Sequence, residues 1–166
     1  MLSQDLVVEP LITENSAVFA DLETRLITYY YKGLVTRENA VASAKWVSDL
    51  YKRIPHEKTF RGGIFDFREV TGFEIGIATV AQKYNREITK MQASNKFPIV
   101  YLVGNVRQEV KVRMSLVLSV GDAARKCVTY YPEEALTFIN EWNLQQNRTF
   151  DLSEETLLAF PKLKTR

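Results

Sequence analysis

The sequence has little of what disulfide and metal sites require. It contains one cysteine, Cys127, and one histidine, His56, among 166 residues. A single cysteine cannot form an intrachain disulfide, which fits a reducing compartment. A single histidine excludes the motifs that need two, so no metal site is expected. The counts still permit a catalytic pair of Cys127 with His56, but Cys127 lies in a strand-like segment, where a buried, inert thiol is the usual outcome.

Long apolar runs and a strong charge of one sign are also missing. No stretch approaches the ~18 apolar residues of a membrane-spanning helix, so no membrane span is expected. The first ten residues lack the basic and apolar regions of a secretory signal, and we expect a cytoplasmic location. The net charge of +2 gives little attraction for phosphate backbones, so no nucleic-acid partner is expected. One basic cluster is interrupted by Glu109 and Asp122, and its members are Arg107, Lys111, Arg113, Arg125 and Lys126.

What is present is the composition of a folded protein. Apolar residues make up 46% of the chain and charged residues 25%, close to globular averages. A chain of this length buries a sizeable core, and no linker or repeat divides it. We therefore expect a single domain over residues 1–166, with residues 145–166 as a C-terminal helical tail.

Strand-like and helix-like segments alternate along the chain. A short edge strand is expected near Pro10, followed by two strands around Glu23 and Thr24, the second closed by Gly33. Thr36 predicts a helix N-cap, and Pro55 ends that helix. Helical periodicity or helix-start residues then predict helices over 77–91, 105–120 and 132–142, separated by strands over 60–67, 97–104 and 126–131. This order predicts the α/β class, with a mixed sheet of about four to five strands and packing helices.

Three of these segments resemble a known family. The stretches "GGIFDFREVTGF", "FPIVYLVG" and "VTYYPEEALTFINEW" are similar to the SpoIIAA-like group of bacterial proteins, distant relatives of the STAS domains of anti-sigma-factor antagonists. The resemblance covers about residues 17–144. It implies a single SpoIIAA-like domain and a regulatory role that works through binding.

The resemblance also bears on a phosphorylation switch. In switched members of the family, a strand ends at an acid, and a phosphorylatable serine preceded by a second acid begins the next helix. Asp66 matches the first acid and Glu74 the second, but Ile75 stands where the serine is expected. The resemblance thus implies that the fold is retained and the serine switch is lost.

Thr71 is the remaining hydroxyl in this loop. Thr71 and Glu74 form a T-x-x-E sequence ahead of an apolar helix, which predicts a capping box in which each side chain bonds the other residue's backbone amide. A phosphate on Thr71 would also suit a helix N-terminus, but it would compete with Glu74 for the same amides. The capping interpretation is favoured over a phosphorylation site.

The remaining candidates follow from where ligands bind in α/β sheets, beyond the carboxyl ends of the strands. Asp66 and Arg68 are expected at one strand end, and Gly104 and Asn105 at the next. Arg68 either holds a carboxylate or phosphate ligand or pairs with an acid of its own strand, the more common case. Asn105 begins an N-x-x-Q sequence, which predicts a helix cap.

No catalytic residue, enzyme activity or cofactor is expected, because no nucleophile–base pair, metal set or phosphate loop stands out. The function expected first is a regulatory or protein-interaction module that binds an unknown protein partner or itself, as a homodimer. The alternative is a protein that binds or senses a small molecule, apolar or nucleotide-like. A closed apolar cavity would favour a ligand, whereas a filled core with an exposed apolar patch would favour a partner.

Overall fold

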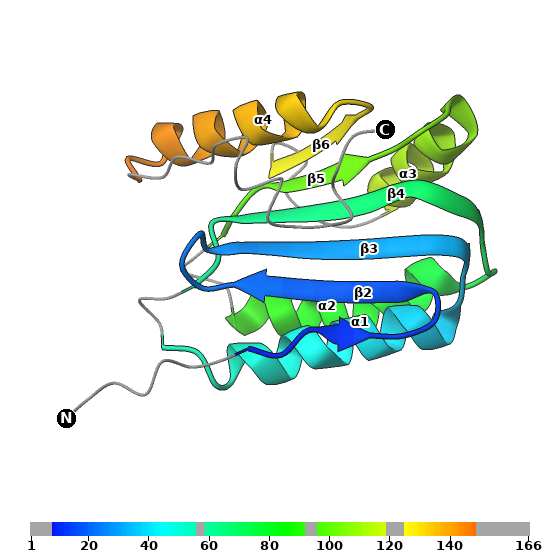
Figure 1. Ribbon diagram of the computed structural model, residues 1–166, viewed down its shortest axis with the longest axis horizontal. Coiled ribbons are helices and arrows are strands. Elements are labelled where there is room, and N and C mark those ends of the chain that lie inside the picture. The colour runs from blue at the N-terminus through cyan, green and yellow to red at the C-terminus, as the bar shows by residue number, and fades with distance from the viewer. Residues whose placement is uncertain (1–7, 56–58, 92–95, 119–124, 149–166) are drawn as a thin grey trace.

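The computed structural model describes residues 8–55, 59–91, 96–118 and 125–148 (Figure 1). His56 and residues 149–166 of the expected tail lie outside this part of the chain. The strands are β1 Leu11–Ile12, β2 Ser16–Asp21, β3 Leu26–Val35, β4 Gly62–Phe73, β5 Ile99–Leu102 and β6 Lys126–Thr129. The helices are α1 Arg37–Tyr51, α2 Ile77–Met91, α3 Val106–Leu118 and α4 Pro132–Gln145. None of these helices is long and apolar enough to cross a membrane.

The strands form one mixed sheet whose spatial order is the order of the sequence, β1 to β6. β1, β2 and β3 are antiparallel neighbours, and β3, β4, β5 and β6 are parallel neighbours. This confirms the α/β class and the mixed sheet. The sheet has six strands where four to five were expected, because even the two-residue β1 pairs with β2.

Helices cover both faces of the sheet. α1, α2 and α3 lie on one face, where alternate sheet residues such as Ile27, Tyr29 and Tyr31 pack against them. α4 lies on the other face. Its side chains contact the strand residues that alternate with those of the first face: Leu26, Ile64, Val100 and Leu102. Figure 1 shows α4 beside β5 and β6, and α1 and α2 near the opposite edge of the sheet, where β1 and β2 lie. β3 is therefore the central strand with two apolar sides that its sequence predicted.

Local sequence signals explain where the helices begin. The Thr36 hydroxyl accepts a hydrogen bond from the Asn39 amide at 3.1 Å, and Glu38 lies in the first turn of α1, as expected. Pro132 occupies the first turn of α4, where its missing amide costs no intrahelical bond. These signals need only neighbouring residues, so they could be read from the sequence.

Two strand ends differ from expectation. Gly33 does not close β3; it has φ +65° within the strand, next to a register shift, and β3 continues to Val35. β4 does not end near Asp66; it continues to Phe73, which pairs with Val35. The physical reason is that Phe73 packs edge-on against Phe67, with ring centroids 5.3 Å apart, so the chain stays extended to place this ring on the core.

Candidate functional site

Asp66 and Arg68 form an ion pair in the middle of β4. The Nε of Arg68 lies 3.0 Å from Oδ1 of Asp66, and Nη2 lies 2.9 Å from Oδ2. The Arg68 backbone amide also donates to Oδ1, at 3.1 Å. The Asp66 side chain is 2% exposed and that of Arg68 is 20% exposed. Of the two interpretations for Arg68, the structure shows pairing with an acid of its own strand, and the pair is largely buried instead of solvated.

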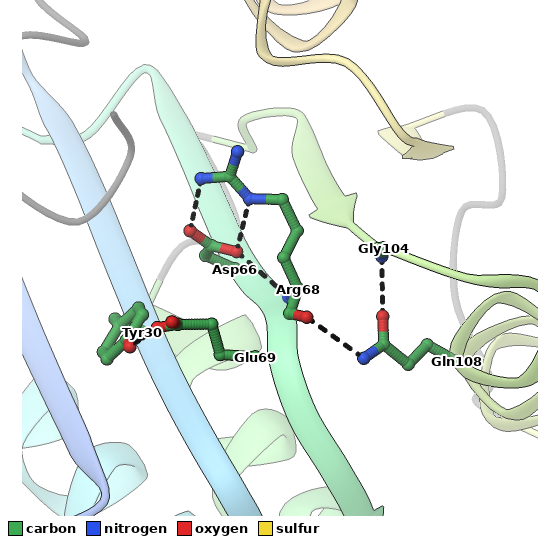
Figure 2. A network of polar contacts seen from close by, with 6 residues as sticks. All are labelled: Tyr30, Asp66, Arg68, Glu69, Gly104 and Gln108. Atoms are coloured by element: carbon green, nitrogen blue, oxygen red, sulfur yellow. Dashed lines mark hydrogen bonds and ion pairs between the residues drawn. The ribbon is translucent and has the colours of Figure 1, made fainter. Parts of the chain in front are cut away.

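A second polar contact lies beside this pair. Tyr30 is the register partner of Asp66, and its hydroxyl donates to the carboxylate of Glu69 (Figure 2). The contact depends on a register shift, since Lys32, two residues on, pairs with Glu69 and not with Arg68. A bulge of this kind turns the side chains of one strand relative to its neighbour. Asp66 and Arg68 thus form one bonded pair, and Tyr30 and Glu69 form a second pair beside it.

Gln108 of α3 joins the helix to the backbone of β4. Its Nε2 donates to the carbonyl of Val70 at 2.6 Å. Its Oε1 accepts from the amide of Gly104 at 2.6 Å (Figure 2). Asn105 Oδ1 accepts from the Gln108 amide at 2.9 Å, which confirms the expected cap. Gly104 cannot readily carry a side chain, because a Cβ would lie 3.1 Å from the carbonyl oxygen of Arg68. The start of α3 is therefore fixed tightly against β4.

Between the end of β4 and the first turns of α3 lies a cleft of about 270 Å³. It brings together Thr71 and Asn105, two of the candidates from the sequence, whereas Asp66, Arg68 and Glu74 are not among its lining residues. None of the described residues that line it carries a carboxylate. Its lining is Val70, Thr71, Gly72 and Phe73 from β4, with Asn105, Arg107, Gln108 and Lys111 from α3.

The expected capping box of Thr71 and Glu74 is wrong. Thr71 is an exposed residue of β4, and α2 begins only at Ile77. The Glu74 amide donates to the carbonyl of Val35, and its carboxylate accepts from the backbone amide of Arg37 at 2.7 Å and from the Arg37 guanidinium at 3.1 Å. These bonds lower the pKa of Glu74, the backbone bond from Arg37 first. Glu74 supports the start of α1, because the extended β4 ends beside it.

The outward face of α3 carries a stripe of exposed apolar side chains. Val106, Val110 and Met114 recur every four residues and are 68%, 50% and 61% exposed. Tyr130 and Tyr131, in the connection from β6 to α4, are also exposed, and the Tyr130 hydroxyl donates to Glu109 of α3. We call Val106, Val110 and Met114 the α3 stripe.

Other candidates from the sequence are not brought together. Cys127 is half-buried, and desolvation, followed by the charge of Glu134, raises the pKa of its thiol, which opposes a nucleophilic role. The basic cluster is dispersed, because Arg125 is buried and donates to the carbonyl of Phe97, while Arg113 pairs with Glu109. Within residues 8–55, 59–91, 96–118 and 125–148, no three His, Cys, Asp or Glu side chains are grouped to hold a metal ion.

Sequence reasoning missed Gln108 as a link to β4 and treated Arg107 and Lys111 only as members of the basic cluster. The spacing of four residues between Arg107 and Lys111 was an available signal, since it places both on one side of a helix. That they face the end of β4 depends on how the helix docks, which no spacing reveals.

Comparisons with known proteins give one result of note. No protein-family model matches this sequence, and no curated protein is significantly similar to it. Among solved structures, the chain is similar to an uncharacterized protein from the DUF3478 family with a SpoIIAA-like fold, from Shewanella loihica PV-4. The identity is 12%, the match covers 75% of this chain and 93% of that chain, and the TM-score is 0.48. The fold name is the one that the sequence segments suggested, and the match brings no activity with it.

Proposed function

We propose that this protein is a non-enzymatic regulatory module that binds another protein through the α3 stripe. The observation that supports the proposal is the continuous exposure of Val106, Val110 and Met114 along one helix. Single exposed apolar residues are common, but an aligned set on one helix is typical of a helix face that another protein covers. Tyr130, whose hydroxyl bonds Glu109 of α3, is exposed and of a residue type enriched at interfaces.

The charges around the stripe indicate the kind of partner. With 3.6 residues per turn, Arg107 and Lys111 border the stripe on one side, and Arg113 borders it on the other. Glu109 is an acidic residue near the same stripe, and its carboxylate accepts hydrogen bonds from Arg113 and Tyr130. A partner surface with an apolar centre and an acidic rim complements this arrangement. Self-association through the same stripe would bring cationic borders together, so we commit to a different protein as the occupant.

The non-enzymatic part of the proposal is supported by the bonds that the candidate charged groups make within the fold. Asp66 is bonded by Arg68, and Glu69 by Tyr30. Ile75, at the position where the resemblance placed a serine, is 91% exposed. We propose that regulation through this turn does not use serine phosphorylation.

Site-specific photo-crosslinking in the native host tests the proposal. A photoreactive benzoylphenylalanine replaces Val110 in one strain, and Thr79, an exposed residue of α2, in a control strain. We expect the residue-110 probe to link to one other protein, at a segment that is apolar with acidic neighbours, and the residue-79 probe not to do so. Val110→Asp should abolish binding of that purified partner, whereas Thr79→Asp should not.

Two outcomes would overturn the proposal. Crosslinks from residue 110 to a second copy of this chain would assign the stripe to a homodimer, the form considered from the sequence. Crosslinks no stronger than those from residue 79 would show that the stripe is an ordinary exposed helix face. Circular dichroism of Val110→Asp confirms that the variant is folded, so that a loss of binding is not a loss of structure.

A further inference from the structure

The α3 stripe contains one side chain whose polarity can be changed by oxidation. Met114 is 61% exposed, and the other two members of the stripe, Val106 and Val110, have side chains of hydrocarbon only. A thioether is apolar and polarizable, so the reduced form of Met114 suits an apolar interface. Oxidation converts the same side chain into a sulfoxide, which is polar and chiral. The apolar character of the α3 stripe therefore depends on the oxidation state of one sulfur atom.

Met114 lies away from the side of α3 that packs on the sheet. That side is formed by Gln108, which is 5% exposed and bonds the Val70 carbonyl, and by Val112, which is 4% exposed and belongs to a core cluster. With 3.6 residues per turn, Val112 and Met114 point about 200° apart around the helix axis. A sulfoxide on Met114 meets water in the free protein, so we expect the packing of α3 to stay as it is.

We propose that Met114 is a reversible oxidation site, and that its sulfoxide prevents the partner from binding the α3 stripe. With hydrogen peroxide as the oxidant, the sulfur attacks one peroxide oxygen and the O–O bond breaks. The proton of the attacked oxygen passes to the departing hydroxide, which leaves as water, and the two electrons lost by sulfur reduce the peroxide. A thiol-dependent reductase reverses the step, because two thiols become a disulfide and the oxygen leaves as water.

This inference rests on the proposed function, because a partner over Met114 would take the sulfoxide oxygen out of water. Burial of a polar oxygen is unfavourable unless the oxygen gains a hydrogen bond. Val106 and Val110 have no donor in their side chains, and the neighbouring Arg113 bonds Glu109. The apolar centre of the partner offers no donor either. We therefore expect oxidation to raise the dissociation constant of the partner by about tenfold.

A second methionine provides the comparison for selectivity. The chain has three methionines, of which Met1 lies outside the described residues. Met91, the last residue of α2, is partly buried. Because peroxide must reach the sulfur atom, we expect Met114 to be oxidised several times faster than Met91. A bound partner covers the stripe, so binding should in turn slow the oxidation of Met114.

Limited treatment of the purified full chain with hydrogen peroxide, followed by peptide mass spectrometry, tests the site. We expect the added oxygen on Met114 before Met91, and weaker retention of the oxidised chain on a hydrophobic-interaction column. The partner identified by the residue-110 crosslink should bind the oxidised chain about tenfold more weakly. Methionine sulfoxide reductase with a thiol should restore both retention and affinity. Circular dichroism of the oxidised chain shows that it remains folded.

Two variants show which sulfur is responsible. Met114→Leu conserves the volume and the apolar character of the side chain, so it should bind the partner before and after peroxide treatment. Met91→Leu should bind it only before treatment, as the parent protein does. A loss of binding by oxidised Met114→Leu would assign the sensitivity to another group, such as the half-buried thiol of Cys127, and would overturn the inference.

Two further results would overturn the inference and leave the proposed function standing. The first is oxidation of Met91 as fast as that of Met114. The second is unchanged affinity for the partner after Met114 has become a sulfoxide. Failure of the untreated chain to bind any partner through the α3 stripe is a different outcome, since it overturns the proposed function and the oxidation switch together.

Discussion

The carboxylate of Asp66 is held by the guanidinium of Arg68, two residues further along the same strand, with both oxygens bonded at 2.9–3.0 Å. Side chains two residues apart lie on the same face of a strand, so the two charged groups lie next to each other on that face. The face is the one on which α4 packs, since Ile64 and Leu102, neighbours of Asp66 in β4 and β5, contact that helix. The pair therefore belongs to the interior of the fold.

The first prediction concerns this pair. Arg68→Met should lower the free energy of unfolding by about 3 kcal/mol, because it leaves the 2% exposed carboxylate of Asp66 without its counter-ion. The double variant Asp66→Leu with Arg68→Met should recover most of the loss, because apolar residues of similar volume often replace a buried pair at no cost. Urea unfolding measures both. A double variant no more stable than Arg68→Met would contradict the interpretation.

The second prediction separates the observed role of Glu74 from the capping box. Glu74→Gln should lower the melting temperature at neutral pH, because it weakens the bonds to Arg37 at the start of α1. The folded-state pKa of Glu74 lies below its usual value of 4.5, so this stability is present above pH 4.5 and is lost as pH falls through the lowered pKa. The difference between the variant and the parent protein should therefore vanish in acid.

Thr71 supplies the matched control for that experiment. Thr71→Val retains a β-branched side chain at an exposed strand position, and the free energy of unfolding should change by no more than about 0.5 kcal/mol. A capping box would instead lose about 1 kcal/mol with its threonine oxygen. A loss of that size in thermal or urea unfolding would restore the capping interpretation.

The third prediction concerns the link between α3 and β4. Gln108→Leu keeps the volume of a 5% exposed side chain but leaves the Val70 carbonyl and the Gly104 amide without their partner. An unsatisfied buried group costs about 1–3 kcal/mol, so the expected loss is about 2–3 kcal/mol. Hydrogen exchange of the Gly104 amide should also accelerate. Unchanged protection of this amide would show that the link is not maintained in solution.

The fourth prediction is an alkaline transition. Burial raises the pKa of Tyr31 and of Tyr101 to about 12, from an ordinary value of 10. Because the folded-state pKa is the higher one, the stability from these tyrosines is complete below pH 10 and is lost as pH rises through 12. Tyr31→Phe should raise the midpoint of alkaline unfolding, measured by circular dichroism. Tyr131→Phe, at a 60% exposed residue, should leave the midpoint unchanged.

The order and type of the elements follow from local patterns in the chain. Thr36 and Asn105 mark helix starts through bonds to the amides of residues three positions on, and Pro132 marks one because its missing amide suits the first turn. The two-sided apolar pattern of β3 identified the central strand in the same way. Such features are readable because their causes lie within one short segment of chain.

The contacts of the candidate residues, in contrast, depend on how distant segments pack. T-x-x-E is a sound cap signal, yet Glu74 bonds Arg37, which is 37 residues away, because β4 extends beside β3 to reach the core with Phe73. Gln108 likewise finds its partner in Val70, 38 residues away. The cleft exists only because α3 docks at the end of β4 and turns Arg107 and Lys111 toward it. These contacts follow from packing and strand register, which join segments that local patterns describe separately.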